Sequence, residues 1–188
     1  NICNYIHLPV QSGNSRILEL MNRGYSREWY LNRIESIRSI IPNCAISMDI
    51  ISGFCSETEE EHQDTLSLMD IVKYDFGYMF SYSERPNTKA QRKFEDNIPT
   101  DVKKKRLQEI IDKQMEHSLF RNQNHVGKTH KVLVEGISKK SKEELFGRNT
   151  QNTVVVFPKE NYKIGDYVLV KVDQCTSATL KGKAIKKA

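Results

Sequence analysis

The sequence predicts two parts with different folds: an α/β part with parallel strands over residues 1–122 and a small all-β barrel over residues 123–188. Three observations predict this division. In the first part, strand-type and helix-type segments alternate at a spacing of roughly 35 residues, which is typical of βαβ units. In the second part, five short β-type runs follow one another within about 60 residues. The net charge also changes, from −3 over residues 1–120 to +8 over residues 121–188.

The first strand and two helices are expected within residues 4–41. Residues 4–8 form a short extended run, and a turn at residues 9–13 separates it from a helix whose apolar pattern stops at Gly24. Ser26 is placed to cap a second helix, whose leucine and isoleucines keep helical spacing until Pro-Asn ends it.

Two further strands and the helix between them complete the α/β part. Residues 44–51 (CAISMDII) are predicted as a buried strand and residues 77–82 (GYMFSY) as the next one. Thr58 and Glu61 form a capping box for the intervening helix. Three parallel strands alone leave two open edges, whereas parallel sheets are normally wider and covered on both faces. We therefore expect the C-terminal portion of a larger α/β barrel or open sheet.

Thr100 is predicted to cap a charged helix that runs to about residue 122 and connects the two parts. After this helix the pattern changes to short β-type runs separated by Gly, Pro, Asn and Lys. Apolar residues alternate within these runs, for example Val168, Val170 and Val172. This pattern predicts a closed or nearly closed small barrel. Its strands are expected at residues 131–137, 145–148, 153–157, 167–174 and 179–185.

Composition excludes several classes of protein. No apolar run approaches the roughly 18 residues of a membrane span, and no signal-peptide pattern is present, so we expect a cytoplasmic protein without a membrane partner. The four cysteines have no CxxC or CxxxCxxC spacing and predict reduced thiols rather than a metal or iron–sulfur site in this chain. The chain starts at Asn1 rather than Met, which suggests a piece of a longer polypeptide.

Three loops follow the predicted parallel strands, where ligands of α/β folds bind. The first contains Gln11, Ser12 and Gly13, which could hold a polar ligand or form a structural turn. The second contains Asp49, Gly53 and Glu57. Asp49 is a carboxylate within an apolar strand, so it requires a partner, either an internal one or a ligand. The third loop begins at Ser81.

The basic second part is typical of a nucleic-acid interface. Small barrels bind single-stranded nucleic acid through cationic grooves and aromatic platforms. Phe146, Phe157 and Tyr162 are candidate platforms, although such residues more often belong to the core. The alternative is a lysine-rich surface without a partner. The polar residues that we expect to contact RNA are Lys128, Lys131, Lys139, Lys140, Arg148, Asn149 and Asn152.

Several segments, taken in order, resemble the methylthiotransferases of the radical SAM superfamily. They are HLPVQSGNSRILELMNRGY (7–25), ISMDIISGFCSETEEE (46–61), YMFSYSERPNTKA (78–90), VGKTHKVLVEG (126–136) and GRNTQNTVVVF (147–157). The resemblance covers nearly the whole chain. This sequence departs from the family pattern where relatives read FPGETEE and YSPRPGT, since it has Cys55 and Ser56 in the first motif and Glu84 and Asn87 in the second.

The resemblance implies the last three strands of a radical SAM (β/α) partial barrel, followed by an OB-like TRAM domain that binds RNA. It further implies S-adenosylmethionine as cofactor and two 4Fe–4S clusters whose ligands lie in the remainder of the same polypeptide, so this chain alone should not be catalytic. Gln11, Ser12, Gly13, Asp49, Gly53 and Glu57 fall at cofactor-facing positions, and Phe80 and Ser81 where the adenine would lie. No catalytic residue can be assigned.

The implied reaction adds a methylthio group to C2 of N6-isopentenyladenosine beside the tRNA anticodon, with the anticodon stem-loop as partner. Three alternatives remain: another tRNA adenosine, an aspartate of a ribosomal protein, or an RNA-binding module without catalysis. A basic ribosomal protein would be repelled by a region of charge +8, which favours RNA.

Overall fold

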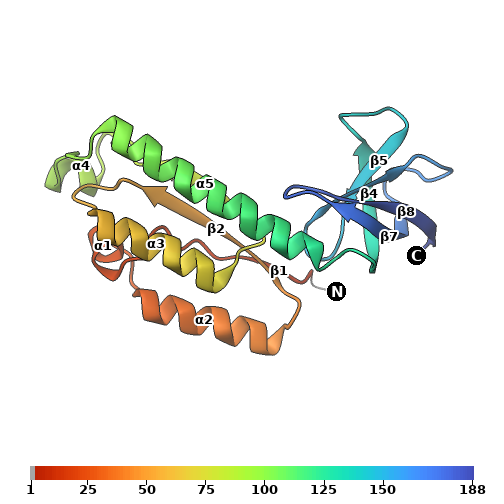
Figure 1. The fold of residues 1–188 in the computed structure, drawn as a ribbon, viewed down its shortest axis with the longest axis horizontal. Helices are drawn as coiled ribbons and strands as arrows, with labels where there is room; N and C mark the ends of the chain where they lie inside the picture. The colour runs from red at the N-terminus through yellow and green to blue at the C-terminus, as the bar shows by residue number, and fades with distance from the viewer. Residues whose placement is uncertain (1–2) are drawn as a thin grey trace. The chain divides into compact units, whose positions relative to one another are not determined.

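The structure is a computed structural model that describes residues 3–188 (Figure 1). Contacts between Cα atoms divide the chain into two compact units. One unit, the α/β unit, comprises His7–Pro42 and Ile46–Met115. The other contains Asn43–Ala45, Glu116–Ala188 and the residues up to Ile6. Within residues 3–188, no helix is both long and apolar enough to cross a membrane.

Three strands form one sheet in the order β1-β2-β3, namely β1 (Tyr5–His7), β2 (Ala45–Ser52) and β3 (Phe76–Ser81). Strands β2 and β3 are parallel, with Ser47 opposite Phe76 and Ser52 opposite Ser81. The prediction of three parallel-type strands separated by helices is confirmed, and each strand lies within one or two residues of its expected position.

Within the described residues, five helices accompany this sheet: α1 (Ser15–Leu20), α2 (Arg27–Ile40), α3 (Glu59–Val72), α4 (Lys89–Lys93) and α5 (Thr100–Gln123). The caps predicted at Ser26 and Thr58 are confirmed, since the Ser26 hydroxyl accepts a hydrogen bond from Trp29 N–H and Thr58 and Glu61 form a capping box on α3. Thr100 is instead the first helical residue of α5. The short helix α4, capped by Thr88, has no counterpart in the sequence prediction because five residues contain too little periodicity to recognise.

The two faces of the sheet differ in burial. Ile46, Met48 and Ile50 of β2 point to one face and are fully buried, as are Leu68 and Met69 of α3 and Ile110 of α5. This is the face covered by helices. Gly77 allows close packing here, because a Cβ atom at that position would lie 2.7 Å from Met48 Sδ. The opposite face presents Ser47, Asp49 and Ile51, together with the β3 residues aligned with them.

The second unit contains a closed five-stranded barrel, as predicted, in the order β4-β5-β6-β8-β7. Its strands are β4 (Thr129–Ile137), β5 (Glu144–Arg148), β6 (Val154–Pro158), β7 (Tyr167–Cys175) and β8 (Leu180–Lys187). Only the β6–β8 pair is parallel among the barrel pairs, and the rest are antiparallel. The alternating valines point inward, and the core comprises Val132, Val134, Leu145, Val155, Phe157, Val168, Val170, Val172 and Leu180.

Candidate functional sites

The uncovered face of the sheet holds a histidine fixed by two polar partners. His7 Nδ1 lies 2.7 Å from Ser47 Oγ, and His7 Nε2 lies 3.4 Å from Asp49 Oδ2. The Asp49 side chain is 29% exposed, so it is only partly removed from water. The partner that Asp49 was predicted to require is therefore an internal one, His7, which leaves the carboxylate open on one side.

Aromatic rings of β3 continue this face. Tyr78 is opposite Asp49 and Phe80 is opposite Ile51 in the parallel register, so their side chains point to the same side of the sheet. Both rings are more than half exposed. Tyr78 also meets His7 edge to face, at 6.2 Å between ring centroids. Of the predicted cofactor residues, the structure thus brings Asp49 and Phe80 together on one face, while Ser81 ends β3 opposite Ser52.

The first predicted loop is anchored by its backbone. Gln11 N donates to Asp49 O at 2.8 Å, and Gln11 O accepts from Ile51 N at 3.0 Å. Gln11 has φ of 71°, an unfavourable value for a residue other than glycine. This pair of bonds holds the buried Gln11 against the end of β2, where a cofactor of this fold class would lie.

Ser12 and Gly13 face helix α3 rather than the open face. The Ser12 hydroxyl is fully buried and lies 3.5 Å from Thr65 Oγ1, while Gly13 N donates to the same Thr65 oxygen at 2.9 Å. A Cβ atom on Gly13 would lie 2.4 Å from Thr65 Cα, so only glycine fits. The structure gives both residues a role in packing the loop, and their contact with a cofactor remains a prediction.

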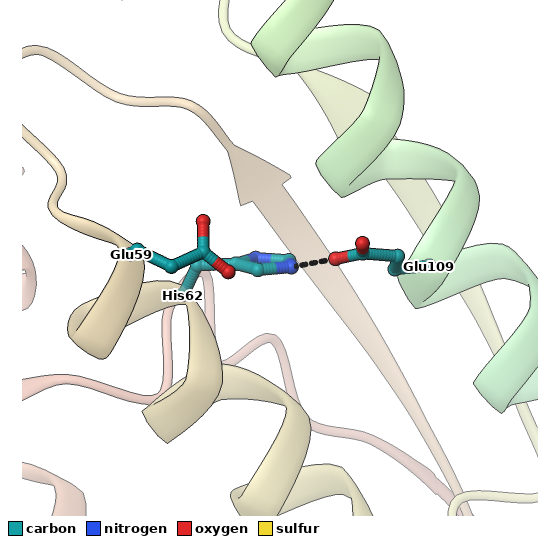
Figure 2. Close-up of side chains that lie close together, drawn as sticks. All are labelled: Glu59, His62 and Glu109. Carbon is teal, nitrogen blue, oxygen red and sulfur yellow. Dashed lines mark hydrogen bonds and ion pairs between the residues drawn. The ribbon is translucent and has the colours of Figure 1, made fainter.

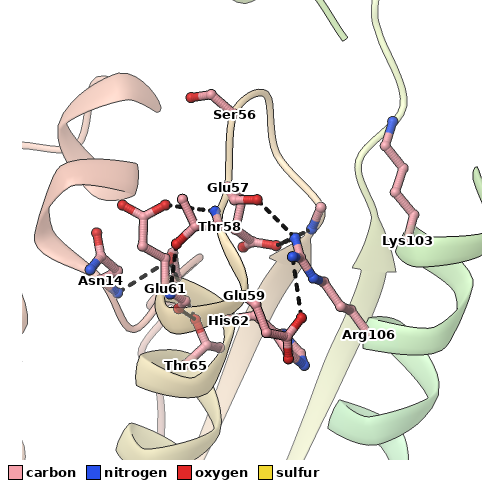
Figure 3. Close-up of polar contacts among 12 residues, drawn as sticks. Asn14, Ser56, Glu57, Thr58, Glu59, Glu61, His62, Thr65, Lys103 and Arg106 are labelled. Carbon is pink, nitrogen blue, oxygen red and sulfur yellow. Dashed lines mark hydrogen bonds and ion pairs between the residues drawn. The ribbon is translucent and has the colours of Figure 1, made fainter. Parts of the chain in front are cut away.

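The loop after β2 is held by a buried ion pair (Figure 3). Glu57 Oε2 accepts from Gly53 N at 2.8 Å and from Arg106 Nη1 at 3.0 Å, and both charged side chains are at least 94% buried. Burial raises the pKa of Glu57, whereas the Gly53 N–H and the Arg106 charge oppose this rise. Predicted residues Gly53 and Glu57 therefore bond directly to each other, and Glu57 has a further partner, Arg106, 49 positions away, that sequence reasoning did not single out.

A second arginine closes the other side of this loop. Arg16 Nε donates to Glu61 Oε1 at 2.6 Å, and Arg16 Nη2 donates to Ser56 O at 2.9 Å. The hydrogen bond from Arg16 is the main cause that lowers the pKa of Glu61. Ser56 has φ of 62°, the left-handed conformation for which the family pattern has glycine. Ser56 thus adopts, without being glycine, a backbone conformation that glycine tolerates best.

Glu59, His62 and Glu109 form the one group of three metal-type ligands found among the described residues (Figure 2). Their donor atoms lie within 4.8 Å of one another, and the fully buried His62 Nε2 lies 2.7 Å from Glu109 Oε2. Both carboxylates also have cationic partners, since Arg106 contacts Glu59 at 3.3 Å and Lys105 contacts Glu109 at 3.6 Å. We interpret the group as an ion-pair network between α3 and α5, because these cations would repel a bound metal ion.

Four of the predicted RNA contacts lie in one depression of the barrel surface, the β4 hollow. Arg148 is paired with Glu135 at 3.4 Å and donates to Asn152 O, and Lys131 Nζ lies 4.5 Å from the Tyr167 ring centroid. Asn149 is buried, and its side-chain oxygen accepts two backbone N–H groups of the β5–β6 turn. The β4 hollow is lined by Lys131, Leu133, Glu135, Arg148, Asn149, Thr150, Asn152 and Tyr167, with Cys3 and Tyr5.

Two more predicted contacts, Lys139 and Lys140, line a second depression, the Phe146 hollow. Phe146 and Arg148 are two positions apart on β5 and both point outward, so the two hollows adjoin along this strand. Lys128 lines neither hollow. The Phe146 hollow is lined by Ser138, Lys139, Lys140, Glu144, Phe146, Val154, Val156, Thr176, Thr179 and Lys181.

The three aromatic residues predicted as stacking platforms differ in their position in the barrel. Phe157 is 1% exposed in the barrel core, and Tyr162 packs against that core, so neither offers a free ring face there. Phe146 lies on the outer surface. Sequence reasoning missed Tyr167 and Lys181, which line the hollows from β7 and β8. Strand alternation was the available signal, because both residues precede or follow buried positions on their strands.

Two family models match the chain. The model of the Radical SAM superfamily matches residues 1–69, and that of the TRAM domain matches residues 123–185. Among solved structures, coproporphyrinogen III oxidase (HemN) from Escherichia coli, a radical SAM enzyme, has a similar fold, with a TM-score of 0.51 and 19% identity. That match covers 78% of this chain and 41% of the oxidase.

Curated relatives match with much higher identity. This chain is 60% identical to the tRNA-2-methylthio-N(6)-dimethylallyladenosine synthase of Flavobacterium johnsoniae and 62% identical to that of Christiangramia forsetii, over 98% of its length in both cases. It spans 38% of the length of each relative. The chain therefore belongs to the radical SAM methylthiotransferase family and carries part of the radical SAM domain together with a TRAM domain.

Proposed function

We propose that this chain is part of an enzyme that adds a methylthio group to C2 of N6-isopentenyladenosine beside the tRNA anticodon. The identity of 60–62% over 98% of the chain, to proteins named as synthases of that modified adenosine, carries the proposal. The chain spans only 38% of those relatives, so the activity is assigned to the whole polypeptide, whose remainder is the first partner of this chain. We place that polypeptide in the cytoplasm, where its tRNA substrate is found.

The open sheet face fits S-adenosylmethionine. Tyr78 and Phe80 offer exposed aromatic surface to a purine, and the partly exposed Asp49 carboxylate offers an acceptor for ribose hydroxyls or an ammonium group. His7 fixes the direction of that carboxylate. When bound, the cofactor supplies a methyl group and, on cleavage, a radical. The residues of this chain bind and orient it, and Gln11 with Glu57 supports the two loops at its edge.

Iron–sulfur clusters do not fit the cysteines of this chain. Cys44 and Cys55 are buried, Cys3 is exposed and Cys175 is intermediate, and none of them belongs to a group of metal-type ligands among residues 3–188. A 4Fe–4S cluster requires converging thiolates. The two clusters that the family implies are therefore assigned to cysteines elsewhere in the polypeptide.

The anticodon stem-loop of tRNA is the proposed macromolecular partner, bound by the region over residues 123–188. Residues 121–188 carry 14 lysines and arginines but six acidic residues. Lys171 of β7 lies directly opposite Lys183 of β8, an unfavourable pair that a phosphate would stabilise. A basic ribosomal protein would be repelled by the same charges, so the alternative substrate, an aspartate of such a protein, is disfavoured.

The test is the modified nucleoside itself. In cells that lack the gene for the whole polypeptide, tRNA should contain N6-isopentenyladenosine without the 2-methylthio group, as measured by mass spectrometry of digested tRNA. Reintroduced wild-type gene should restore the group, and Asp49→Asn should restore less of it than Asp101→Asn, an exposed carboxylate at the start of α5. Unchanged tRNA in the deletion strain, with loss of a methylthio mark from ribosomal protein, would show that the substrate is the protein.

A further inference from the structure

Phe146 is partly exposed on the outer side of β5, and its ring packs against a glycine of the neighbouring strand. Gly136 of β4 is opposite Phe146 of β5 in the antiparallel register. A Cβ atom on Gly136 would lie 2.9 Å from Phe146 Cε1 and 3.5 Å from Cζ, so the ring occupies the space that a side chain would take. The phenyl group is therefore held against β4, and its partly exposed ring lines the Phe146 hollow.

The surface beside this platform is apolar. Val156 of β6 is opposite Phe146, and Lys181 of β8 is opposite Val156, so these three outward-facing residues form one row across three strands. Val154 lies two positions from Val156 and lines the same hollow. An apolar floor next to a partly exposed aromatic ring suits a flat ring system, and every nucleobase has a π-face that can stack on such a ring.

Cations surround the floor on two sides. Lys139 and Lys140 come from the β4–β5 loop and Lys181 from β8, while Glu144 is the single acidic residue of the lining. Among the residues that the structure describes, none of these three lysines forms an ion pair, in contrast to Arg148 in the β4 hollow, which is paired with Glu135. A nucleotide fits this arrangement, because its base can lie on the apolar floor while its phosphates contact the unpaired ammonium groups at the edge.

We propose that the Phe146 hollow binds a single unpaired RNA nucleotide, whose base stacks on Phe146 and whose flanking phosphates contact Lys139, Lys140 and Lys181. The inference rests on the proposed RNA partner and adds that this site reads strandedness. In an A-form duplex both faces of each base are covered by stacking, so a paired nucleotide cannot reach the ring. The hydroxyl of Thr179, which also lines the hollow, is an additional hydrogen-bonding group for ribose or base, whereas the Thr176 hydroxyl is already bonded to the backbone of its own turn.

The test measures binding of the full 188-residue chain to a short fluorescein-labelled polyuridine RNA and to an RNA duplex of the same length, by fluorescence anisotropy over a series of salt concentrations. Phe146→Leu keeps an apolar side chain but removes the aromatic face. It should weaken binding of the single strand by about 5- to 150-fold, the range for loss of one stacked base. Phe146→Trp should retain binding, which separates loss of stacking from loss of folding. Duplex binding should be unchanged in both variants.

Charge variants test the other half of the site. Lys139→Gln with Lys140→Gln should lower the slope of log K against log salt by about 0.7 for each lost phosphate contact. Lys163→Gln, an exposed lysine of the same barrel that lines neither hollow, is the matched control and should change the slope less. Equal single-strand affinity of wild type and Phe146→Leu would overturn this inference while leaving RNA binding intact. Absence of RNA binding by the wild-type chain would overturn both this inference and the proposed RNA partner.

Discussion

Replacement of Arg106 by methionine should destabilise the α/β unit far more than the same replacement at Arg16. Arg106 Nη1 donates to Glu57 Oε2 and to Glu57 O, both at 3.0 Å, and its side chain is 6% exposed. Methionine has similar length but no charge, so the variant leaves the Glu57 carboxylate buried without its cation. Loss of one partner from a buried ion pair costs about 3–5 kcal/mol.

The lower end of that range applies here. Glu57 retains the hydrogen bond from Gly53 N at 2.8 Å, which compensates part of the charge, so we expect a loss of about 3 kcal/mol. With a urea slope of about 1–3 kcal/mol per M, the midpoint should fall by about 1–3 M. Trp29 is the single tryptophan of the chain and lies in α2, so its fluorescence follows unfolding of the α/β unit specifically.

Arg16→Met provides the matched control. Arg16 also pairs with a glutamate of the same loop region, Glu61, but its side chain is 47% exposed, and exposed pairs contribute about 0.2–1 kcal/mol. The double variant Glu57→Gln with Arg106→Met should recover part of the loss, because no buried charge remains. Two results would refute the assignment of Glu57 and Arg106 as a buried, mutually dependent pair. One is an equal shift of the urea midpoint for Arg106→Met and Arg16→Met. The other is a double variant that is less stable than Arg106→Met alone.

The effect of Arg106→Met should also depend on pH. Burial raises the pKa of Glu57 above its ordinary value, and Arg106 opposes that rise, so its removal raises the pKa further. A raised pKa in the folded state means that the folded state binds more protons than the unfolded state at intermediate pH. Stability is then lost as pH rises through the folded-state pKa of Glu57. The deficit of Arg106→Met should therefore be larger at about pH 7 than at about pH 5.

Two further variants test local features. Ser56→Gly should raise the urea midpoint measured by Trp29 fluorescence, because Ser56 has φ of 62° and a left-handed conformation costs a residue other than glycine about 1–2 kcal/mol. Asn87→Gly, at φ of 67°, should raise the midpoint less, because asparagine tolerates this region. Equal gains would contradict the reasoning. In the barrel, burial lowers the pKa of His125 to about 4, so the folded state resists protonation and stability should fall as pH decreases from about 6.5 to 4. His125→Gln should reduce that fall, as read from hydrogen-exchange protection factors of β4 and β7, and an identical pH dependence would show that other groups cause it.

Fold and order of elements were predictable because they depend on local periodicity. The alternating valines of β7 and the capping box of Thr58 with Glu61 are patterns within a few residues, and both appear in the structure as expected. The closure of five strands also followed from their number and length. The helix α4 was missed because its five residues give no periodic signal.

The functions of individual polar residues were less predictable, because their partners lie far away in sequence. Ser12 and Gly13 were assigned to a cofactor from their place after a strand, yet their contacts in the structure are with Thr65, about 50 residues further on. Glu57 was assigned to the cofactor site in the same way, and its partner Arg106 lies on α5, which follows α3, β3 and α4 in the chain. No pattern within either segment indicates the other.

These internal partners are compatible with a cofactor site and explain how one could be stable. A loop that must stay open toward a ligand cannot bury its own outer surface, so its position has to be fixed from behind. Thr65 holds the first loop through Gly13 N, and Arg106 holds the second through Glu57 and the Gly53 N–H bonded to it. The side chains that remain on the open face, Asp49 and Phe80, can then differ from core residues in polarity and exposure. The buried Glu57–Arg106 pair and the exposed sheet face therefore depend on each other, because the ion pair restricts the motion of a loop whose outer side has no packing partner.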